Sequence, residues 1–257
     1  MYSHTGKNPG VQIPRPKPLA KLRLFCLPHA GGTSTAFREW ADDLPGAIEL
    51  CIVEIPGHGY RLNEALMHRL QPLVMQVAQD IEPYLDKPFV IFGHSMGNLL
   101  GFELSHYLQN AYQKTPVHLF LSGRGAPHLP PREEPIHQLP EDQFIQKITE
   151  YNGTPKEVLQ HKELMDLMLP ILRCDFEVCE TYRFSPKPPF SFPMTIFGGL
   201  SDPGSTKSDL QEWKRYTTAS FSLRMFPGDH FFIFSAQKQL LQAIVRDIND
   251  HFPISTG

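Results

Sequence analysis

The sequence lacks the features that mark membrane, secreted and nucleic-acid-binding proteins. Its longest apolar runs, such as residues 22–27 and 89–92, fall far short of the roughly 18 residues that a membrane-spanning helix needs. The N-terminus has no apolar segment of the kind found in secretory signals. No run of Lys and Arg exceeds two residues and the net charge is -3, so there is no basic surplus to neutralise phosphates. We therefore expect a cytoplasmic protein that binds neither membranes nor nucleic acid.

Cysteine is also scarce and is not arranged for metal binding or cross-linking. The four cysteines, Cys26, Cys51, Cys174 and Cys179, form no CxxC pair, and two of them lie in apolar runs that resemble strands. Neither disulfides nor a metal site are expected. With 41% hydrophobic residues in a chain of 257, there is ample material for a core.

Proline, in contrast, is abundant, with 25 residues, about twice the ordinary usage. The prolines cluster in residues 1–20 and 127–140. The first cluster predicts an extended, poorly ordered N-terminal tail, followed by one domain over residues 21–257. The second indicates a long connection inside that domain.

Short runs rich in β-branched and aromatic residues alternate with helical patterns along most of the chain. This alternation predicts an α/β fold with a mostly parallel central sheet and helices on both faces. The predicted strands are residues 22–27, 50–55, 89–92, 117–121, 194–197 and 221–226. The predicted helices are residues 35–44, 70–85, 98–112, 208–216 and 236–251.

The alternation is interrupted at residues 124–193, where helical patterns recur without a convincing strand. We predict an inserted helical subdomain with helices at residues 141–151, 156–161 and 163–183. Its last helix carries an apolar stripe that something must cover, by packing on the sheet domain or other insert helices, or by lining an acyl pocket. The stripe consists of Leu164, Leu167, Met168, Ile171 and Leu172. Leu164, Met168 and Leu172 are our candidates for substrate contacts.

The strongest chemical signal is a G-x-S-x-G motif, Gly93-His94-Ser95-Met96-Gly97, which lies between a predicted strand and a predicted helix. In that context the motif forms a strained turn that exposes a nucleophilic serine, and the glycines avoid collisions with the neighbouring strand and helix. Ser95 is therefore the candidate nucleophile.

A serine hydroxyl needs a base, and the base needs an orienting acid; in this architecture both follow the serine in the chain. His230 follows the last predicted strand, and Asp202 follows the strand at residues 194–197. Both should emerge at the carboxyl edge of the sheet. Asp229 and Asp175 are weaker candidates for the acid. Asp229 adjoins His230 in sequence, so its side chain should point away from the imidazole.

A third element is an oxyanion hole. The segment Leu27-Pro28-His29-Ala30-Gly31-Gly32 leaves the first strand like the glycine-rich loop that lends a backbone N–H in these folds. The N–H groups of Ala30 and Met96 are the expected donors, although the glycines alone would also suit a tight turn. No phosphate-binding glycine motif is present. His29 is expected near the cleft, and His94 and His58 beside or beneath the serine turn.

Together these motifs resemble the stand-alone type II thioesterases that accompany nonribosomal peptide and polyketide synthases, within the α/β-hydrolase superfamily. The resemblance runs from about residue 22 to residue 250. It is carried by the segments LFCLPHAGG (24–32), IPGHGYR (55–61), PFVIFGHSMG (88–97), LFLSGRGAP (119–127), NGTP (152–155), LPILRCDFEVCETY (169–182), FGGLSDP (197–203) and GDHFF (228–232). The RxDFExxExY stretch within residues 173–182 is far more specific than G-x-S-x-G.

The resemblance implies a triad of Ser95, Asp202 and His230, a mobile lid over residues 124–193, and no metal or bound cofactor. It also implies an acyl group on the phosphopantetheine arm of an acyl or peptidyl carrier protein as the substrate, in antibiotic biosynthesis. We expect a monomer. Two alternatives stay open: a general carboxylesterase or lipase, and a ligand-binding protein that retains the fold without turnover.

Overall fold

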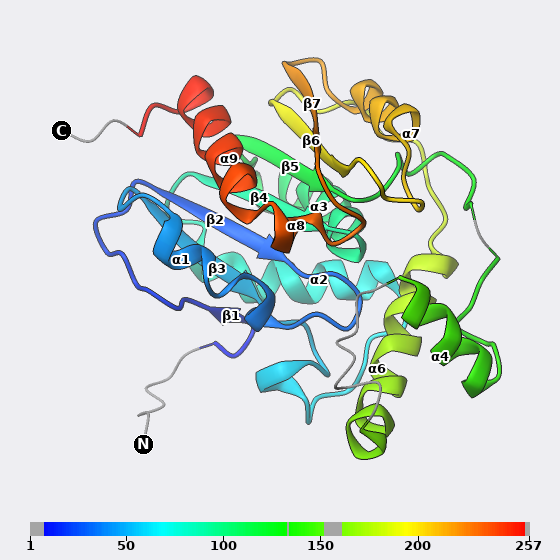
Figure 1. The fold of residues 1–257 in the computed structure, drawn as a ribbon. Coiled ribbons are helices and arrows are strands. Elements are labelled where there is room, and N and C mark those ends of the chain that lie inside the picture. The colour runs from blue at the N-terminus through cyan, green and yellow to red at the C-terminus, as the bar shows by residue number, and fades with distance from the viewer. Residues whose placement is uncertain (1–7, 133, 152–160, 255–257) are drawn as a thin grey trace.

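The computed structural model describes residues 8–132, 134–151 and 161–254. The described residues form a seven-stranded sheet in the order β1-β3-β2-β4-β5-β6-β7, covered by helices on both faces (Figure 1). The strands are β1 Val11–Gln12, β2 Leu22–Leu27, β3 Ile48–Val53, β4 Phe89–His94, β5 His118–Ser122, β6 Met194–Gly199 and β7 Phe221–Phe226. Within this sheet β1 runs antiparallel to β3, and the other neighbours are parallel. The predicted mostly parallel sheet is confirmed.

Helices form two layers because the side chains of each strand alternate between the two faces of the sheet. In β2, Phe25 and Leu27 belong to the core shared with α2 and α3, whereas Leu24 and Cys26 belong to the core shared with α1 and α9. The α-helices of the described residues are α1 Trp40–Asp43, α2 Leu70–Ile81, α3 Met96–Tyr107, α4 Glu141–Glu150, α6 Lys162–Thr181, α7 Lys207–Gln211, α8 Phe232–Ser235 and α9 Gln237–His251.

Several predicted helices end earlier or are divided into segments. The segment at residues 35–44 splits into the 3-10 helix η1 Ser34–Phe37 and α1. In the same way α2 continues into the 3-10 helix η3 Glu82–Tyr84, α3 into the π-helix η4 Leu108–Tyr112, and α7 into the 3-10 helix η5 Glu212–Tyr216. A further 3-10 helix is η2 Gly59–Arg61.

The prediction of a poorly ordered N-terminal tail is wrong for residues 8–20. Val11 is buried, and its strand pairs with β3. The Asn8 side chain donates a hydrogen bond to the backbone oxygen of Asp80, and the Lys17 ammonium donates to the carbonyls of Leu44 and Pro45. This segment therefore covers one edge of the sheet despite its prolines.

The segment between β5 and β6 contains α4 and α6, which lie beside the sheet domain (Figure 1). The two helices share a small apolar core of their own, which includes Phe144, Met165, Leu169 and Leu172. The predicted helix at residues 156–161 and the NGTP motif fall at residues 152–161, of which the structure describes only His161. The insert is thus built from helices in its described part.

The order of the strands places a switch point between β2 and β4. The chain passes from β2 to β3 on one side and then returns to β4 on the other side of β2. Loops after these two strands diverge, and ligands of open α/β sheets bind in the crevice so formed. The residues that follow β2 and β4 are those of the predicted oxyanion loop and the G-x-S-x-G motif.

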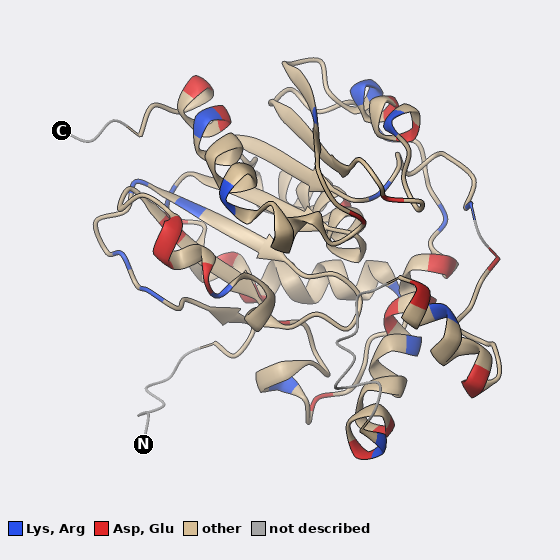
Figure 2. Ribbon diagram, in the orientation of Figure 1, with Lys and Arg blue, Asp and Glu red and all other residues tan. Residues whose placement is uncertain are grey.

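Charged residues lie mainly on helices and loops, with Lys and Arg interspersed among Asp and Glu (Figure 2). In the part of the chain that the structure describes, no helix combines the length and apolarity that crossing a membrane requires.

Candidate active site

Ser95 occupies a strained turn between β4 and α3. Its φ of 56° and ψ of -110° lie outside the usual regions for a residue with a side chain. The turn needs glycine on both sides: a Cβ on Gly93 would lie 1.9 Å from the carbonyl oxygen of Gly97, and one on Gly97 would lie 2.2 Å from that of Leu27. The close approach lets α3 begin directly after Ser95, at the carboxyl edge of the sheet.

Asp202 and His230 follow the neighbouring parallel strands β6 and β7. Their loops are held together by a hydrogen bond of 2.9 Å from the Ser201 N–H to the carbonyl oxygen of Gly228. A Cβ on Gly199 would lie 2.2 Å from the backbone oxygen of Asp229, so the approach of the loops requires glycine there. Within this arrangement His230 Nδ1 lies 2.9 Å from Asp202 Oδ2.

The surroundings of Asp202 favour its ionised form. Its side chain is only 1% exposed, and burial alone would raise the pKa of the carboxyl. The hydrogen bonds and charge of His230, the hydroxyl of Ser205 and the N–H of Gly204 outweigh that effect, so the pKa of Asp202 lies below its usual value. A carboxylate at this position fixes Nδ1 as the protonated nitrogen of a neutral His230 and leaves Nε2 free to accept a proton.

The other two candidate acids have different partners. Asp229 turns its carboxylate toward its own loop, where Oδ1 accepts a hydrogen bond of 2.9 Å from the Phe231 N–H. Asp175, on α6, accepts a hydrogen bond from the Gly31 N–H and contacts His58. Asp202 is thus the acid that the geometry pairs with His230.

Two buried histidines lie beside His230. The His94 ring packs 4.9 Å from that of His230 and is hydrogen-bonded through Nδ1 to the Ser122 hydroxyl. Burial, and then the neighbouring charge of His230, lowers the pKa of His29 to about 4 and lowers the pKa of His94 well below its usual value. Both rings are therefore neutral near neutral pH. His94 is part of the G-x-S-x-G motif, and the ring of His29 lies 6.1 Å from its ring.

The predicted oxyanion loop is a tight turn. The Gly32 N–H donates to the His29 carbonyl oxygen at 2.8 Å, and Gly31, at the third position of the turn, has a φ of 71°. These features fit a type II turn, which requires a positive φ at that position. The internal hydrogen bond does not use the N–H of Ala30. Met96 is the first residue of α3, where backbone N–H groups have no partner within the helix.

Helix α6 of the insert packs against this turn. A Cβ on Gly31 would lie 2.6 Å from Cδ2 of Leu172 and 3.7 Å from Cε of Met168. Of the predicted stripe, Ile171 and Leu172 are buried, whereas Leu164 and Leu167 are 45% and 47% exposed, so packing among the described residues covers only part of it. The side of α6 that packs on α4 includes Met165, Leu169 and Leu172.

The RxDFExxExY stretch serves to anchor α6, a role that the sequence reasoning did not assign. Each of its polar residues has a partner on another segment: Arg173 with the carbonyl of His137, Asp175 with Gly31 and His58, Glu177 with His68 and Arg69, Glu180 with the N–H groups of Ile136 and His137, and Tyr182 with Glu103. His58, which is expected beside or beneath the serine turn, contacts Asp175 of α6. His58 and Asp175 lie in the family-specific motifs at residues 55–61 and 173–182, and these motifs were the signal that could have linked the two residues.

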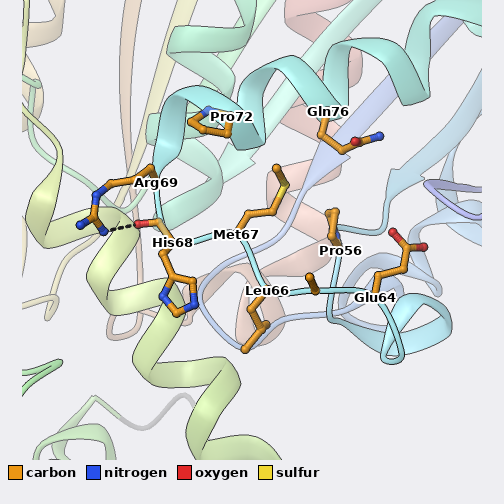
Figure 3. Close-up of a pocket in the computed structure, with 9 residues that line it drawn as sticks. Pro56, Glu64, Leu66, Met67, His68, Arg69, Pro72 and Gln76 are labelled. Carbon is orange, nitrogen blue, oxygen red and sulfur yellow. Dashed lines mark hydrogen bonds between the residues drawn. The ribbon is translucent and has the colours of Figure 1, made fainter.

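An open pocket of about 380 Å³ lies between the segment before α2 and the start of that helix (Figure 3). Arg69 and His68 line it, and both are paired with Glu177 of α6. None of the candidate catalytic side chains lines this pocket, so it is separate from the serine site.

The sheet, the strained serine turn and the acid–base pair after the two following strands define an α/β-hydrolase. A family model described as "Thioesterase domain" matches residues 22–252. The chain therefore belongs to the thioesterase-domain family, and within it to the type II thioesterases of nonribosomal peptide and polyketide biosynthesis. The family resemblance carried by the sequence motifs is confirmed.

Relatives cover nearly the whole chain. The gramicidin S biosynthesis protein GrsT of Aneurinibacillus migulanus is 43% identical over 229 residues, covering 89% of this chain and 90% of that protein. The structure of the type II thioesterase BorB from the borrelidin biosynthetic cluster has a TM-score of 0.86 at 30% identity, covering 95% of this chain and 99% of the other. YbtT, a type II thioesterase from the yersiniabactin pathway, has a TM-score of 0.84 at 28% identity, covering 95% and 98%.

Proposed function

We propose that this chain hydrolyses acyl thioesters held on the phosphopantetheine arm of carrier proteins, as an editing enzyme, with Ser95, His230 and Asp202 as its triad. The observation that carries the proposal is the hydrogen bond between His230 and Asp202 at the sheet edge where Ser95 stands in its strained turn. Membership of the thioesterase family supplies the kind of ester that is cleaved.

The reaction proceeds in two halves. In the first, His230 Nε2 accepts the proton of the Ser95 hydroxyl while Ser95 Oγ attacks the thioester carbonyl carbon. The C–S bond breaks, the thiol of the arm leaves with a proton from His230, and an acyl-serine ester remains. In the second half His230 activates a water that hydrolyses this ester, and the acid is released with Ser95 restored. Asp202 stays ionised and holds the imidazole throughout.

The oxyanion of each tetrahedral intermediate binds to the N–H groups of Ala30 and Met96. One comes from the turn after β2 and the other from the first residue of α3, so they converge at the switch point of the sheet. Donors fixed by the backbone need no reorganisation when charge develops on the oxygen.

The helical insert, residues 124–193, acts as a lid over the acyl group. Met168 and Leu172 lie at the turn that carries Ala30. Leu164 lies one helical turn before Met168, with about half of its side chain exposed. We assign these three residues to acyl contacts. Leu164 would become covered only when substrate or carrier protein is bound.

An acyl or peptidyl carrier protein is the partner that this chemistry implies, because the acyl group arrives on its flexible arm. Action as a monomer in the cytoplasm remains a prediction from the sequence.

The proposal is tested by comparing kcat/KM for one acyl group on a carrier protein, on a pantetheine thiol and on the matching oxygen ester. We expect the carrier thioester to be preferred, chiefly through a lower KM, since the added contacts lie away from the reacting carbonyl. Preference for the oxygen ester would instead indicate a general carboxylesterase. Failure of Ser95 to react with a fluorophosphonate, alongside no turnover, would indicate a binding protein without catalysis.

A further inference from the structure

Asp175 joins the lid helix to the oxyanion turn through a buried carboxylate. The residue is 2% exposed and lies in α6. Its Oδ2 accepts a hydrogen bond of 2.6 Å from the Gly31 N–H and lies 2.9 Å from Nε2 of His58. His58 lies on the loop after β3, so three segments distant in the sequence meet at one oxygen atom.

The contacts of His58 favour a doubly protonated ring. Nδ1 lies 3.0 Å from the backbone oxygen of Pro56, which can only accept a hydrogen bond, and Nε2 faces the carboxylate of Asp175. Beside an ionised Asp175, both contacts are hydrogen bonds only when both nitrogens carry a proton. Burial alone would lower the pKa of His58, but Asp175, assisted by the Pro56 carbonyl and the charge of Glu54, holds that pKa above its usual value.

The position of Gly31 connects this ion pair to catalysis. Gly31 is the third residue of the turn whose second residue is Ala30, and its N–H belongs to the central peptide of that turn. That peptide is planar and joins Ala30 to Gly31, so fixing its orientation also restricts the backbone of Ala30. The turn's own hydrogen bond leaves this N–H free, and Asp175 provides its partner.

We propose that Asp175 and His58 form an ionic clasp through which the docked lid helix sets the oxyanion turn, so that the turn is competent only while α6 is in place. The inference rests on the proposed function. Asp175 and His58 are positioning residues, since neither reaches the reacting atoms in this arrangement. Movement of α6 away from the sheet domain would take the carboxylate from Gly31 and leave the turn free to relax.

The first test replaces Asp175 by Asn, which keeps the size of the side chain and removes its charge. For D175N we expect kcat on a carrier-bound acyl group to fall about 10- to 100-fold, the scale of a small misplacement of catalytic groups, with KM little changed. The matched control is Asp166→Asn, which makes the same chemical change at an exposed residue of α6 that is not among the anchoring residues named above. The control should retain wild-type kcat.

The second test is the pH profile of kcat. Because the pKa of His58 is raised, the clasp is intact below the usual histidine range and is lost as the pH rises through that raised value. Wild-type kcat should therefore fall on the alkaline side, and that fall should be absent in His58→Gln, whose side chain does not titrate. The double variant D175N/H58Q should lose no more kcat than the larger of the two single losses.

Equal losses of kcat in D175N and D166N would overturn the clasp, as would a loss confined to KM or to the melting temperature. An alkaline fall that persists unchanged in H58Q would also overturn it. If D175N does not fold, H58Q and its pH profile decide the question alone. Failure of the proposed function is separate: it would appear as retained turnover in Ser95→Ala, whatever the Asp175 variants do.

Discussion

Leu172 of helix α6 lies directly against Gly31 of the turn after β2: a Cβ placed on the glycine would be 2.6 Å from Cδ2 of the leucine. Met168, one turn earlier on α6, lies near the same point. The wall that these side chains form is therefore next to the group that is proposed to bind the oxyanion. An acyl chain attached to Ser95 would extend from that place.

Truncation of this wall should alter the choice of acyl length. Met168→Ala and Leu172→Ala enlarge the space beside the turn, and a change of one or two methylenes in an apolar pocket is worth about 1 to 3 kcal/mol of discrimination. We expect the preferred chain to become longer while the profile stays broad. The measurement is kcat/KM for a series of acyl lengths on a carrier protein.

Leu164→Ala serves as the comparison, because Leu164 is on the same helix but 45% exposed. It should shift the profile less than the other two changes. An unmoved profile in M168A and L172A would remove the lid from the determination of specificity. Leu172 is also buried, so a loss of roughly 2 to 5 kcal/mol of stability is expected for L172A and must be measured separately.

Ser95→Ala should abolish turnover and leave the fold unchanged. The substitution removes only the attacking oxygen, and alanine introduces no new atom into the strained turn. Circular dichroism and the melting temperature should match the wild type, while hydrolysis of a carrier-bound acyl group falls below a few per cent. More residual activity than that in a folded variant would mean that Ser95 is not the nucleophile.

Asp202→Asn should reduce kcat by a factor on the order of 10⁴, the size of effect that this change has in serine proteases, because the amide favours the wrong imidazole tautomer. The carboxylate also accepts hydrogen bonds from Ser205 and Gly204, so the melting temperature should be recorded with the rates.

The matched control for the acid is Asp229→Asn, at the residue next to His230. Its carboxylate bonds within its own loop, so the variant should keep most of its activity. If D229N were the more damaging change, the assignment of the acid to Asp202 would have to be abandoned.

The predicted strands were recognisable because each is a short run rich in apolar residues and bounded by turn residues. β2 and β7 begin and end at the predicted residues, and the other predicted strands differ by a few residues at their ends. β1 was missed since two residues in a proline-rich segment carry no periodic signal, and only their pairing with β3 defines them.

The face of the lid helix could not be chosen from the sequence. Between Leu164 and Leu172 nearly every residue is apolar, so a stripe through Leu164 and Leu167 and one through Met165 and Leu169 fit the helical period almost equally well. Packing on α4 selects the second. Similarly, His58 and Asp175 are 117 positions apart, and no local pattern connects them.

The serine turn allows a prediction that depends on the backbone alone. A Cβ on Gly93 would lie 1.9 Å from the Gly97 carbonyl oxygen and 2.4 Å from its carbonyl carbon, atoms that belong to the first turn of α3 and cannot swing aside as a side chain can. Gly93→Ala should therefore displace α3 from β4. The loss of folding stability should exceed that of ordinary overpacking, which is about 1 to 3 kcal/mol.

Gly46→Ala is the matched control, because a Cβ there meets nothing within 4 Å. We expect G93A to yield little folded protein or a much lower melting temperature, whereas G46A should stay within about 0.5 kcal/mol of the wild type. Wild-type stability together with wild-type turnover in G93A would show that the turn can relax, and the strain at Ser95 would then not depend on its neighbouring glycine.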